Sequence, residues 1–187
     1  MITGEGRNPG DPDPRRITER VIRVDQAGEF GAVRIYEGQL AALRLKGRAN
    51  SEAGRKIAAM AHAEREHRAT FDRLLVQRRV RPTALSPLWH LAGFALGAAT
   101  ALISDEAAMA CTVAVEETID EHYASQATAL GDDEAELRAT VEKFRAEEVE
   151  HRDTALASGA EETLGYGPLT TAIKAGSRLA IWLSTRI

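Results

Sequence analysis

Residues 64–70 read Glu-Arg-Glu-His-Arg-Ala-Thr, and residues 148–154 read Glu-Val-Glu-His-Arg-Asp-Thr. Both stretches follow the pattern E-x-E-H-R-x-T, in which a glutamate precedes a histidine by three residues. Residues three apart lie on one face of an α-helix, so each stretch directs a carboxylate and an imidazole to the same side. One Glu-x-x-His pair is common by chance. A repeat with matching flanking residues indicates two related helices with one chemical role.

A second pattern, E-x6-Y-x2-Q, also occurs twice, at residues 29–39 and at residues 116–126. Each copy lies upstream of one Glu-x-x-His stretch. The chain therefore resembles two copies of a helix hairpin, each of which offers a single glutamate followed by a Glu-x-x-His pair.

Four carboxylates and two imidazoles are the ligand set of ferritin-like di-iron and di-manganese four-helix bundles. Oxygen and imidazole donors without thiolate suit iron or manganese, and iron suits a site that reacts with dioxygen. Four buried glutamates would repel one another or take up protons, and two divalent cations would remove that conflict. The predicted metal ligands are Glu29, Glu64, His67, Glu116, Glu148 and His151.

The rest of the chain favours an all-α fold, because helix-forming residues dominate and proline is scarce. Thr18 and Ser51 are the predicted N-caps of the first two helices, and Gly47 is a predicted helix stop. We expect a flexible tail over residues 1–17 and one ferritin-like bundle domain over residues 18–187. The apolar spacing predicts helices at residues 18–46, 51–79, 104–131, 133–157 and 169–185.

The connection between the two hairpins is unusual, because residues 82–104 contain no charged side chain. It is interpreted as a buried crossover helix, a transmembrane span, or an interfacial segment with Trp89 and Phe94 among lipid headgroups. The amphipathic helix at residues 169–185 is either docked on the bundle or a second membrane contact. Together the two segments favour association with a membrane surface.

Composition excludes several classes of function. The net charge of -4 and the isoelectric point near 5.8 give no electrostatic footprint for nucleic acid. Cys111 is the single cysteine, so neither an intrachain disulfide nor a cysteine-based metal site can form. Residues 3–16 lack the apolar core of a secretory signal, which favours a protein that stays in a bacterial cytoplasm.

Some residues near the ligands carry weaker expectations. Asp25 and Asp153 are candidate acceptors for the N–H of a ligand histidine. Gly28 and Gly31 either leave room beside the metal or permit close helix packing. Four glutamates are expected to point away from the metal and to be solvated or paired with arginine: Glu66, Glu117, Glu147 and Glu150.

Four stretches resemble the 5-demethoxyubiquinone hydroxylase family of ubiquinone biosynthesis: RVDQAGEFGA at 23–32, VAVEETI at 113–119 with His122 and Tyr123 after it, EEVEH at 147–151, and AGSRLAI at 175–181. The resemblance covers almost everything after residue 20. It implies a monooxygenase that hydroxylates the ring of a 2-polyprenyl-3-methyl-6-methoxy-1,4-benzoquinol with dioxygen and two electrons. The prenyl tail of such a substrate implies a peripheral membrane protein on the cytoplasmic face of a bacterial inner membrane.

The resemblance also implies roles for individual residues. Glu29, Glu64 and His67 would ligate one iron; Glu116, Glu148 and His151 would ligate the other; Glu64 and Glu148 would bridge both. His122 and Tyr123 would take part in substrate or electron handling. Glu121 stands where relatives often have a second histidine, which weakens a detailed proton-relay assignment.

Three other functions fit parts of the pattern. A ferritin-like ferroxidase or iron-binding protein would use the same six ligands without an organic substrate. A rubrerythrin-like peroxidase is less compatible, since one cysteine cannot build the usual electron-transfer centre. A bundle whose carboxylates bind no metal is the non-enzymatic alternative. For the hydroxylase, the electron donor is either a reductase partner or a nicotinamide, and other ubiquinone-biosynthesis proteins are candidate partners.

Overall fold

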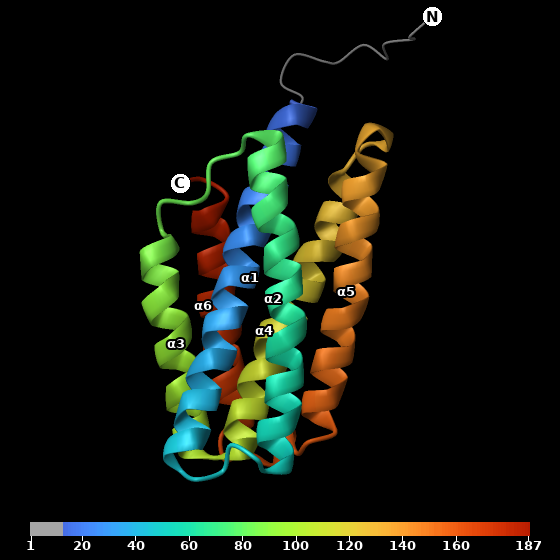
Figure 1. The fold of residues 1–187 in the computed structure, drawn as a ribbon. Coiled ribbons are helices and arrows are strands. Elements are labelled where there is room, and N and C mark those ends of the chain that lie inside the picture. Colours follow the sequence, from blue (N-terminus) through green and yellow to red (C-terminus); the bar gives the residue numbers. More distant parts are fainter. Residues whose placement is uncertain (1–12) are drawn as a thin grey trace, which may run out of the picture.

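Four long helices form the bundle of this protein, in a computed structural model that describes residues 13–187 (Figure 1). The bundle consists of α1 (Pro14–Leu45), α2 (Glu52–Arg78), α4 (Asp105–Ala129) and α5 (Ala135–Leu156). Two further helices, α3 (Ser86–Ile103) and α6 (Tyr166–Ser184), pack on the outside, against α1 and α4 respectively. The predicted all-α bundle with a crossover helix and a C-terminal helix is confirmed.

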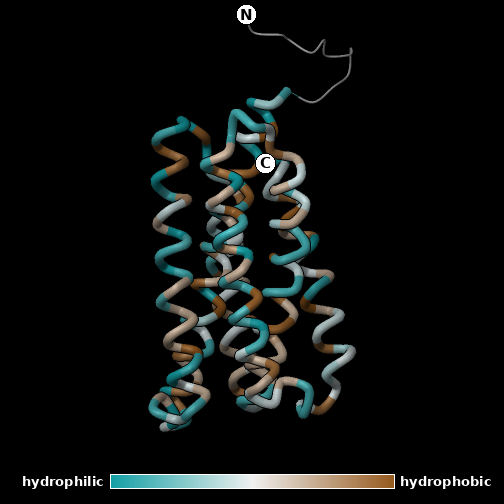
Figure 2. The backbone as a smooth tube through the Cα atoms, turned by 90° about the vertical axis from the view of Figure 1, so that its right-hand side faces the viewer, coloured by the Kyte–Doolittle hydropathy of each residue, from teal (hydrophilic) through white to brown (hydrophobic). Residues whose placement is uncertain are grey.

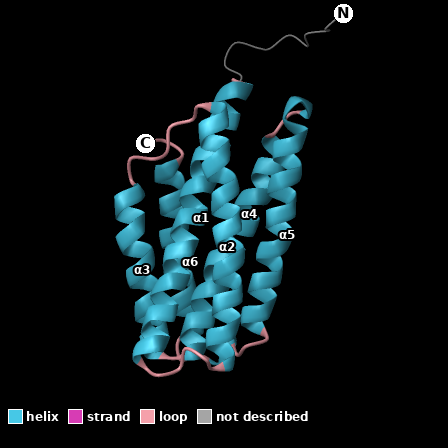
Figure 3. Cartoon of the chain, viewed as in Figure 1, coloured by secondary structure: helices cyan, strands magenta, loops and turns pink. Residues whose placement is uncertain are grey.

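Short connections join successive helices at the two ends of the bundle (Figure 3). Two of them contain single 3-10 turns, η1 (Asp132–Glu134) and η2 (Ala160–Glu162). The pairs α1–α2 and α4–α5 are the two hairpins expected from the repeats, and α3 connects them. Of the flexible tail predicted over residues 1–17, residues 1–12 lie outside the described residues, whereas residues 14–17 form the start of α1.

Two of the predicted helix ends, at Ser51 and Gly47, are confirmed, and two are wrong. Ser51 caps α2 by accepting a hydrogen bond from the amide of Gly54 at 3.1 Å, and Gly47 ends α1 with a φ of 68°. Thr18 is not a cap: α1 begins four residues earlier, where Asp13 accepts from the amide of Arg15 at 3.1 Å. Helix α6 also begins early, at Tyr166. Its proline lies in the first turn, where an amide N–H has no intrahelical acceptor.

The buried interior is layered along the bundle axis. Hydrophobic and hydrophilic residues alternate along the helices, as expected for helices with one buried face (Figure 2). Two apolar clusters occupy different levels, and the glutamates and histidines of the two repeats lie between them. One cluster includes Leu43, Ile57, Met60, Met109 and Val113; the other includes Ile22, Phe71, Tyr123, Val141 and Phe144.

Glycines let α3 approach α1 closely. A Cβ atom at Gly97 would collide with the carbonyl oxygen of Ile35, and one at Gly38 would collide with the backbone of Phe94. By contrast, nothing lies within 4 Å of a Cβ built at Gly28 or Gly31. Close helix packing is therefore not the reason for these two glycines, although they do leave open space beside Glu29.

Helix α3 lies mainly on the surface, because only 22% of its residues are buried. The buried-crossover interpretation is therefore wrong for most of its length. It is the one helix within residues 13–187 that is long and apolar enough to cross a membrane. The exposed apolar side chains on α3 and at the C-terminal end of the chain are Leu88, Leu91, Leu102, Ile103, Leu179, Trp182 and Ile187.

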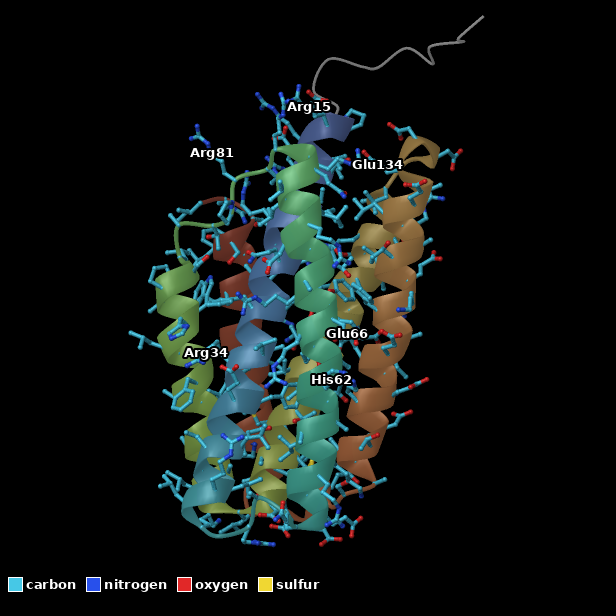
Figure 4. The ribbon with its side chains drawn as sticks, in the orientation of Figure 1. Arg15, Arg34, His62, Glu66, Arg81 and Glu134 are labelled. Atoms are coloured by element: carbon cyan, nitrogen blue, oxygen red, sulfur yellow. The ribbon has the colours of Figure 1, made fainter. Side chains whose placement is uncertain are left out.

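Trp89 and Phe94 are only partly exposed, in contrast to those residues. The indole N–H of Trp89 donates to the hydroxyl of Ser184 at 3.0 Å and so ties α3 to the end of α6. The guanidinium of Arg34 covers the ring of Phe94 at 4.9 Å, reaching from α1 toward α3 (Figure 4). Both aromatic side chains therefore help to hold α3 on the bundle.

Candidate metal centre

All four helices of the bundle contribute to one buried cluster, whose members are Glu29 of α1, Glu64 and His67 of α2, Glu116 of α4, and Glu148 and His151 of α5. Five of the six side chains are almost completely buried, and His151 keeps 12% exposure. The structure thus brings together every ligand predicted from the repeats.

The cluster contains two overlapping groups of four ligand atoms, each within 4.8 Å: Glu29, Glu64, His67 and Glu148, and Glu64, Glu116, Glu148 and His151. Only Glu64 and Glu148 belong to both groups. The imidazoles reach across the bundle in the same way: Nδ1 of His67 lies 3.1 Å from Glu148, and Nδ1 of His151 lies 3.1 Å from Glu64. Each group has the size and the donors of a metal site.

The carboxylates of this cluster lack the partners that burial requires. No hydrogen-bond donor from the described residues reaches Oε2 of Glu29, Oε2 of Glu116 or either oxygen of Glu64. Buried polar atoms are normally paired, so several orphaned oxygens at one point call for a cation. The residues therefore fit a metal ion, and the cluster can hold one.

Electrostatics within the cluster divides the glutamates into two kinds. Burial, followed by repulsion from neighbouring carboxylates, raises the pKa of Glu64 and of Glu116 well above the ordinary value. Burial also acts to raise the pKa of Glu148, but hydrogen bonds from His151 and His67 outweigh it and hold that pKa low. Glu148 therefore stays ionised without a cation.

The repeated tyrosines hydrogen-bond across the bundle to the single glutamates. Tyr36 donates to Oε1 of Glu116 at 2.6 Å, and Tyr123 donates to Oε1 of Glu29. Each tyrosine thus serves the glutamate of the other repeat. Burial and the adjacent carboxylates raise the pKa of both hydroxyls, which keeps them protonated as donors.

His122 lies outside the ligand cluster, although it is next to Tyr123 in sequence. Its Nε2 lies 2.9 Å from the amide nitrogen of Gln126, which also donates to Asp25 at 2.6 Å. Burial lowers the pKa of His122 to about 4. One side of the ring borders a surface cleft of about 330 Å³ between α4 and α6, where Trp182 and Arg178 also lie.

The contacts around the centre correct the expectation for Asp25 and Asp153 and agree with the expectation that Glu117 and Glu66 point away from the metal. Asp25 is buried but meets Gln126, not a ligand imidazole, whereas Asp153 pairs with Arg152 at the surface. Glu117 pairs with Lys174. Glu66 lies exposed beside His62 on α2 (Figure 4).

Glu147 was wrongly expected to point away from the centre. Its Oε2 lies 2.6 Å from Nε2 of His67, and its other oxygen lies 3.3 Å from Lys143. The helical position of Glu147 relative to Glu148 could not reveal this contact, because it depends on how closely α2 and α5 approach. The one available signal was its place directly before a ligand in the second repeat.

Comparisons with known proteins point to one family. A family model described as "Ubiquinone biosynthesis protein COQ7" matches residues 16–184. A 3-demethoxyubiquinol 3-hydroxylase of Rhodospirillum rubrum is 56% identical over 185 residues, which cover 99% of this chain and 85% of the relative. Mitochondrial NADPH-dependent 3-demethoxyubiquinone 3-hydroxylases of Dictyostelium discoideum and Homo sapiens are 51% and 49% identical, covering 92% of this chain and 79% of each relative.

Proposed function

Because this chain belongs to the ubiquinone biosynthesis protein COQ7 family, we propose that its buried cluster holds two iron ions and that it hydroxylates the ring of a demethoxyubiquinol. The chain is a hydroxylase of ubiquinone biosynthesis, and the hydroxylase names of its relatives do not favour the ferroxidase alternative. The observation that carries the metal proposal is the pair of four-atom groups that share Glu64 and Glu148.

Each repeat supplies one metal position in this proposal. Glu29 and His67 would hold one ion, Glu116 and His151 the other, and Glu64 and Glu148 would bridge them. Two bound iron ions would supply the electrons and the Lewis acidity that activate dioxygen for transfer of one oxygen atom to the quinol ring. The glutamate oxygens that have no hydrogen-bond partner among the described residues would balance the positive charge of the two ions.

The protein's own groups would control protons at the centre. Tyr123 donates its hydroxyl proton in a hydrogen bond to the proposed ligand Glu29. One ring nitrogen of His122 contacts Gln126, which donates to the buried Asp25, and the ring borders the cleft, so His122 would link the cleft to buried polar groups. We assign His122 and Tyr123 to substrate or proton handling on this placement.

The exposed apolar side chains give this protein a surface suited to a bilayer. They lie on α3, on α6 and at the C-terminal Ile187, and a hydrogen bond from Trp89 to Ser184 joins the two helices. Trp182 of α6 lines the cleft beside His122. A polyprenyl tail would stay in lipid while its quinol ring enters here, and this supports our proposal of a peripheral protein on the cytoplasmic face of a bacterial inner membrane.

Mass analysis of the quinol tests the hydroxylase reaction. Iron-loaded protein is mixed anaerobically with a short-tailed demethoxyubiquinol, then given NADPH, the donor in the names of several relatives, and oxygen. We expect one added oxygen atom, and no product from Glu148→Ala or His151→Ala. Glu150→Ala is the matched control, because Glu150 is exposed on the same helix. Product from either ligand variant at the wild-type rate would contradict the ligand assignment.

Pelleting with anionic liposomes tests the membrane surface separately. Leu91→Gln and Trp182→Gln should each reduce the bound fraction, because both remove exposed apolar area from the proposed contact. Val76→Gln serves as control, since Val76 is an exposed apolar residue on α2. Equal losses in all three variants, or no binding by the unaltered protein, would contradict this surface assignment.

A further inference from the structure

The two ligand histidines differ in the contact made by the outer ring nitrogen, which is the nitrogen that faces away from the ligand cluster. Nε2 of His67 lies 2.6 Å from Oε2 of Glu147. A carboxylate at this distance accepts, so Nε2 carries the proton. The other ring nitrogen, Nδ1, then faces Glu148 at 3.1 Å and Glu29 at 3.7 Å, on the side of the ligand cluster.

His151 has no such support. Its Nδ1 faces Glu64 at 3.1 Å and Glu148 at 3.2 Å, as expected from the repeat. Within residues 13–187, however, no acceptor contacts its second ring nitrogen. Each imidazole thus lies 3.1 Å from the Glu-x-x-His glutamate of the other repeat, but in this part of the chain only His67 has an acceptor on its second ring nitrogen.

The sequence repeat explains this difference. The two Glu-x-x-His stretches are 84 residues apart, so Glu147 of the second repeat corresponds to Ala63 of the first. Inner contacts cross between repeats reciprocally: His67 meets Glu148, and His151 meets Glu64. By the same relation, Glu147 serves His67, and the residue that would serve His151 is Ala63. A carboxylate is present in one half and missing in the other.

The ring of His67 is also fixed by packing. Phe144 of α5 stacks against it with centroids 4.0 Å apart and planes inclined by 28°. The position that corresponds to Phe144 in the first repeat is Met60, which lacks a ring. His67 is therefore held by a hydrogen bond and by an aromatic face, while its exposed fraction is 2%, against 12% for His151.

We propose that Glu147 is a positioning residue that makes the Glu29–His67 half the tighter metal position, leaving the Glu116–His151 half as the weaker one. The inference rests on the proposed metal centre. A carboxylate on the outer N–H of a ligand histidine fixes the tautomer, orients the ring and raises its basicity, and losing it typically weakens metal binding by about 10–100-fold. The first ion to bind therefore occupies the His67 half, and the second to bind leaves first.

Anaerobic titration of the metal-free protein with Fe²⁺ against a colorimetric chelator measures the two binding steps. We expect Glu147→Gln to weaken the first step by about 10–100-fold, because the amide keeps the shape but loses the charge. Glu150→Gln is the control, because Glu150 lies three residues after Glu147 on the same helix and is exposed; it should leave both binding steps unchanged. The thermal midpoint of each metal-free variant shows whether the fold is intact.

Two further backgrounds separate positioning from a general loss of negative charge. In His151→Ala protein, Glu147→Gln should weaken the first step by the same factor as in the wild type. In His67→Ala protein it should have no effect, because its partner is gone. Ala63→Glu should tighten the second step by supplying the missing carboxylate to His151.

The outcomes distinguish this inference from the proposed function. Wild-type protein that binds no Fe²⁺ overturns the metal centre and this inference with it. Two bound ions with unchanged constants in Glu147→Gln overturn the inference alone. The inference is also overturned if Glu147→Gln weakens Fe²⁺ binding in His67→Ala protein as much as it does in the wild type. If Ala63→Glu leaves the second binding step unchanged, the missing carboxylate is not the cause of the asymmetry.

Discussion

Tyr36 of α1 donates a hydrogen bond of 2.6 Å to Oε1 of Glu116 on α4, and its counterpart Tyr123 returns the relation by donating to Glu29 on α1. The two repeats are therefore interlocked: neither hairpin satisfies its own single glutamate. Because both hydroxyls are buried with their acceptors, each bond links the stability of one hairpin to the position of the other. This explains why the tyrosine is part of the repeated pattern.

Removing the Tyr36 hydroxyl should destabilise the metal-free protein. Tyr36→Phe leaves Oε1 of Glu116 buried without a donor, which typically costs about 1–3 kcal/mol. Urea unfolding monitored by circular dichroism measures the change in free energy. Tyr166→Phe is the control, because within the described chain its hydroxyl makes no hydrogen bond. Equal unfolding midpoints for Tyr36→Phe and the wild type would show that the bond contributes nothing.

Glu64→Gln should stabilise the metal-free protein while abolishing its metal binding. Burial and neighbouring carboxylates raise the folded-state pKa of Glu64 above its unfolded value. Such a group favours the fold below the unfolded pKa and loses that contribution as pH rises, so at pH 7 the carboxylate is a penalty. We therefore expect the metal-free Glu64→Gln protein to unfold at a higher urea concentration than the wild type at pH 7.

The control for that substitution is Glu66→Gln, an exposed glutamate on the same helix, whose effect should stay within about 0.5 kcal/mol. Unfolding with and without Fe²⁺ supplies both readouts. A less stable metal-free Glu64→Gln protein would mean that the contact from His151 to Glu64 outweighs repulsion among the carboxylates.

His122 should make the protein less stable in acid. Its folded-state pKa is about 4, below the ordinary value of 6.5, because burial disfavours the charged ring. Between these values the unfolded chain binds a proton that the folded chain does not. The stability contribution is complete above pH 6.5 and is lost as pH falls toward 4, by up to about 1.4 kcal/mol per pH unit.

The measurement is the free energy of unfolding of His122→Gln relative to wild type from pH 4 to 7. Asp25, 3.7 Å from Nε2, is the nearest acidic group, so Asp25→Asn is compared in parallel. His62→Gln should leave the slope unchanged, because His62 is exposed. Identical slopes for His122→Gln and wild type would place the titrating group elsewhere.

The ligands could be predicted from sequence because a helix fixes which residues share a face, and two matching repeats leave little choice of partner. Glu64 and His67 needed no tertiary information to be paired. Glu147 and Asp25 did, because their partners lie on other helices, and a helical position gives direction but not the distance to the next helix. The same holds for Trp89 and Phe94, whose apolar character predicted lipid contact although packing against α6 and α1 uses both.

Helix ends were harder to predict than helix faces, because several residues can cap. Thr18 and Asp13 are both acceptable N-caps, and Pro14 after Asp13 decides between them, since proline suits the first helical position. The role of Gly28 and Gly31 also depended on the structure: only built Cβ atoms distinguish a glycine that another helix touches from one beside open space.

Gly97 and Gly28 should respond in opposite ways to alanine. Gly97→Ala places a Cβ against the carbonyl oxygen of Ile35, so α3 must shift from α1, and such overpacking costs about 1–3 kcal/mol. Gly28→Ala meets nothing within 4 Å and should stabilise α1 by about 0.5–1 kcal/mol. Urea unfolding gives both values. If Gly28→Ala is more stable yet hydroxylates poorly, the space beside Glu29 is needed by substrate; if Gly97→Ala unfolds like wild type, α3 is not held on α1 by this contact.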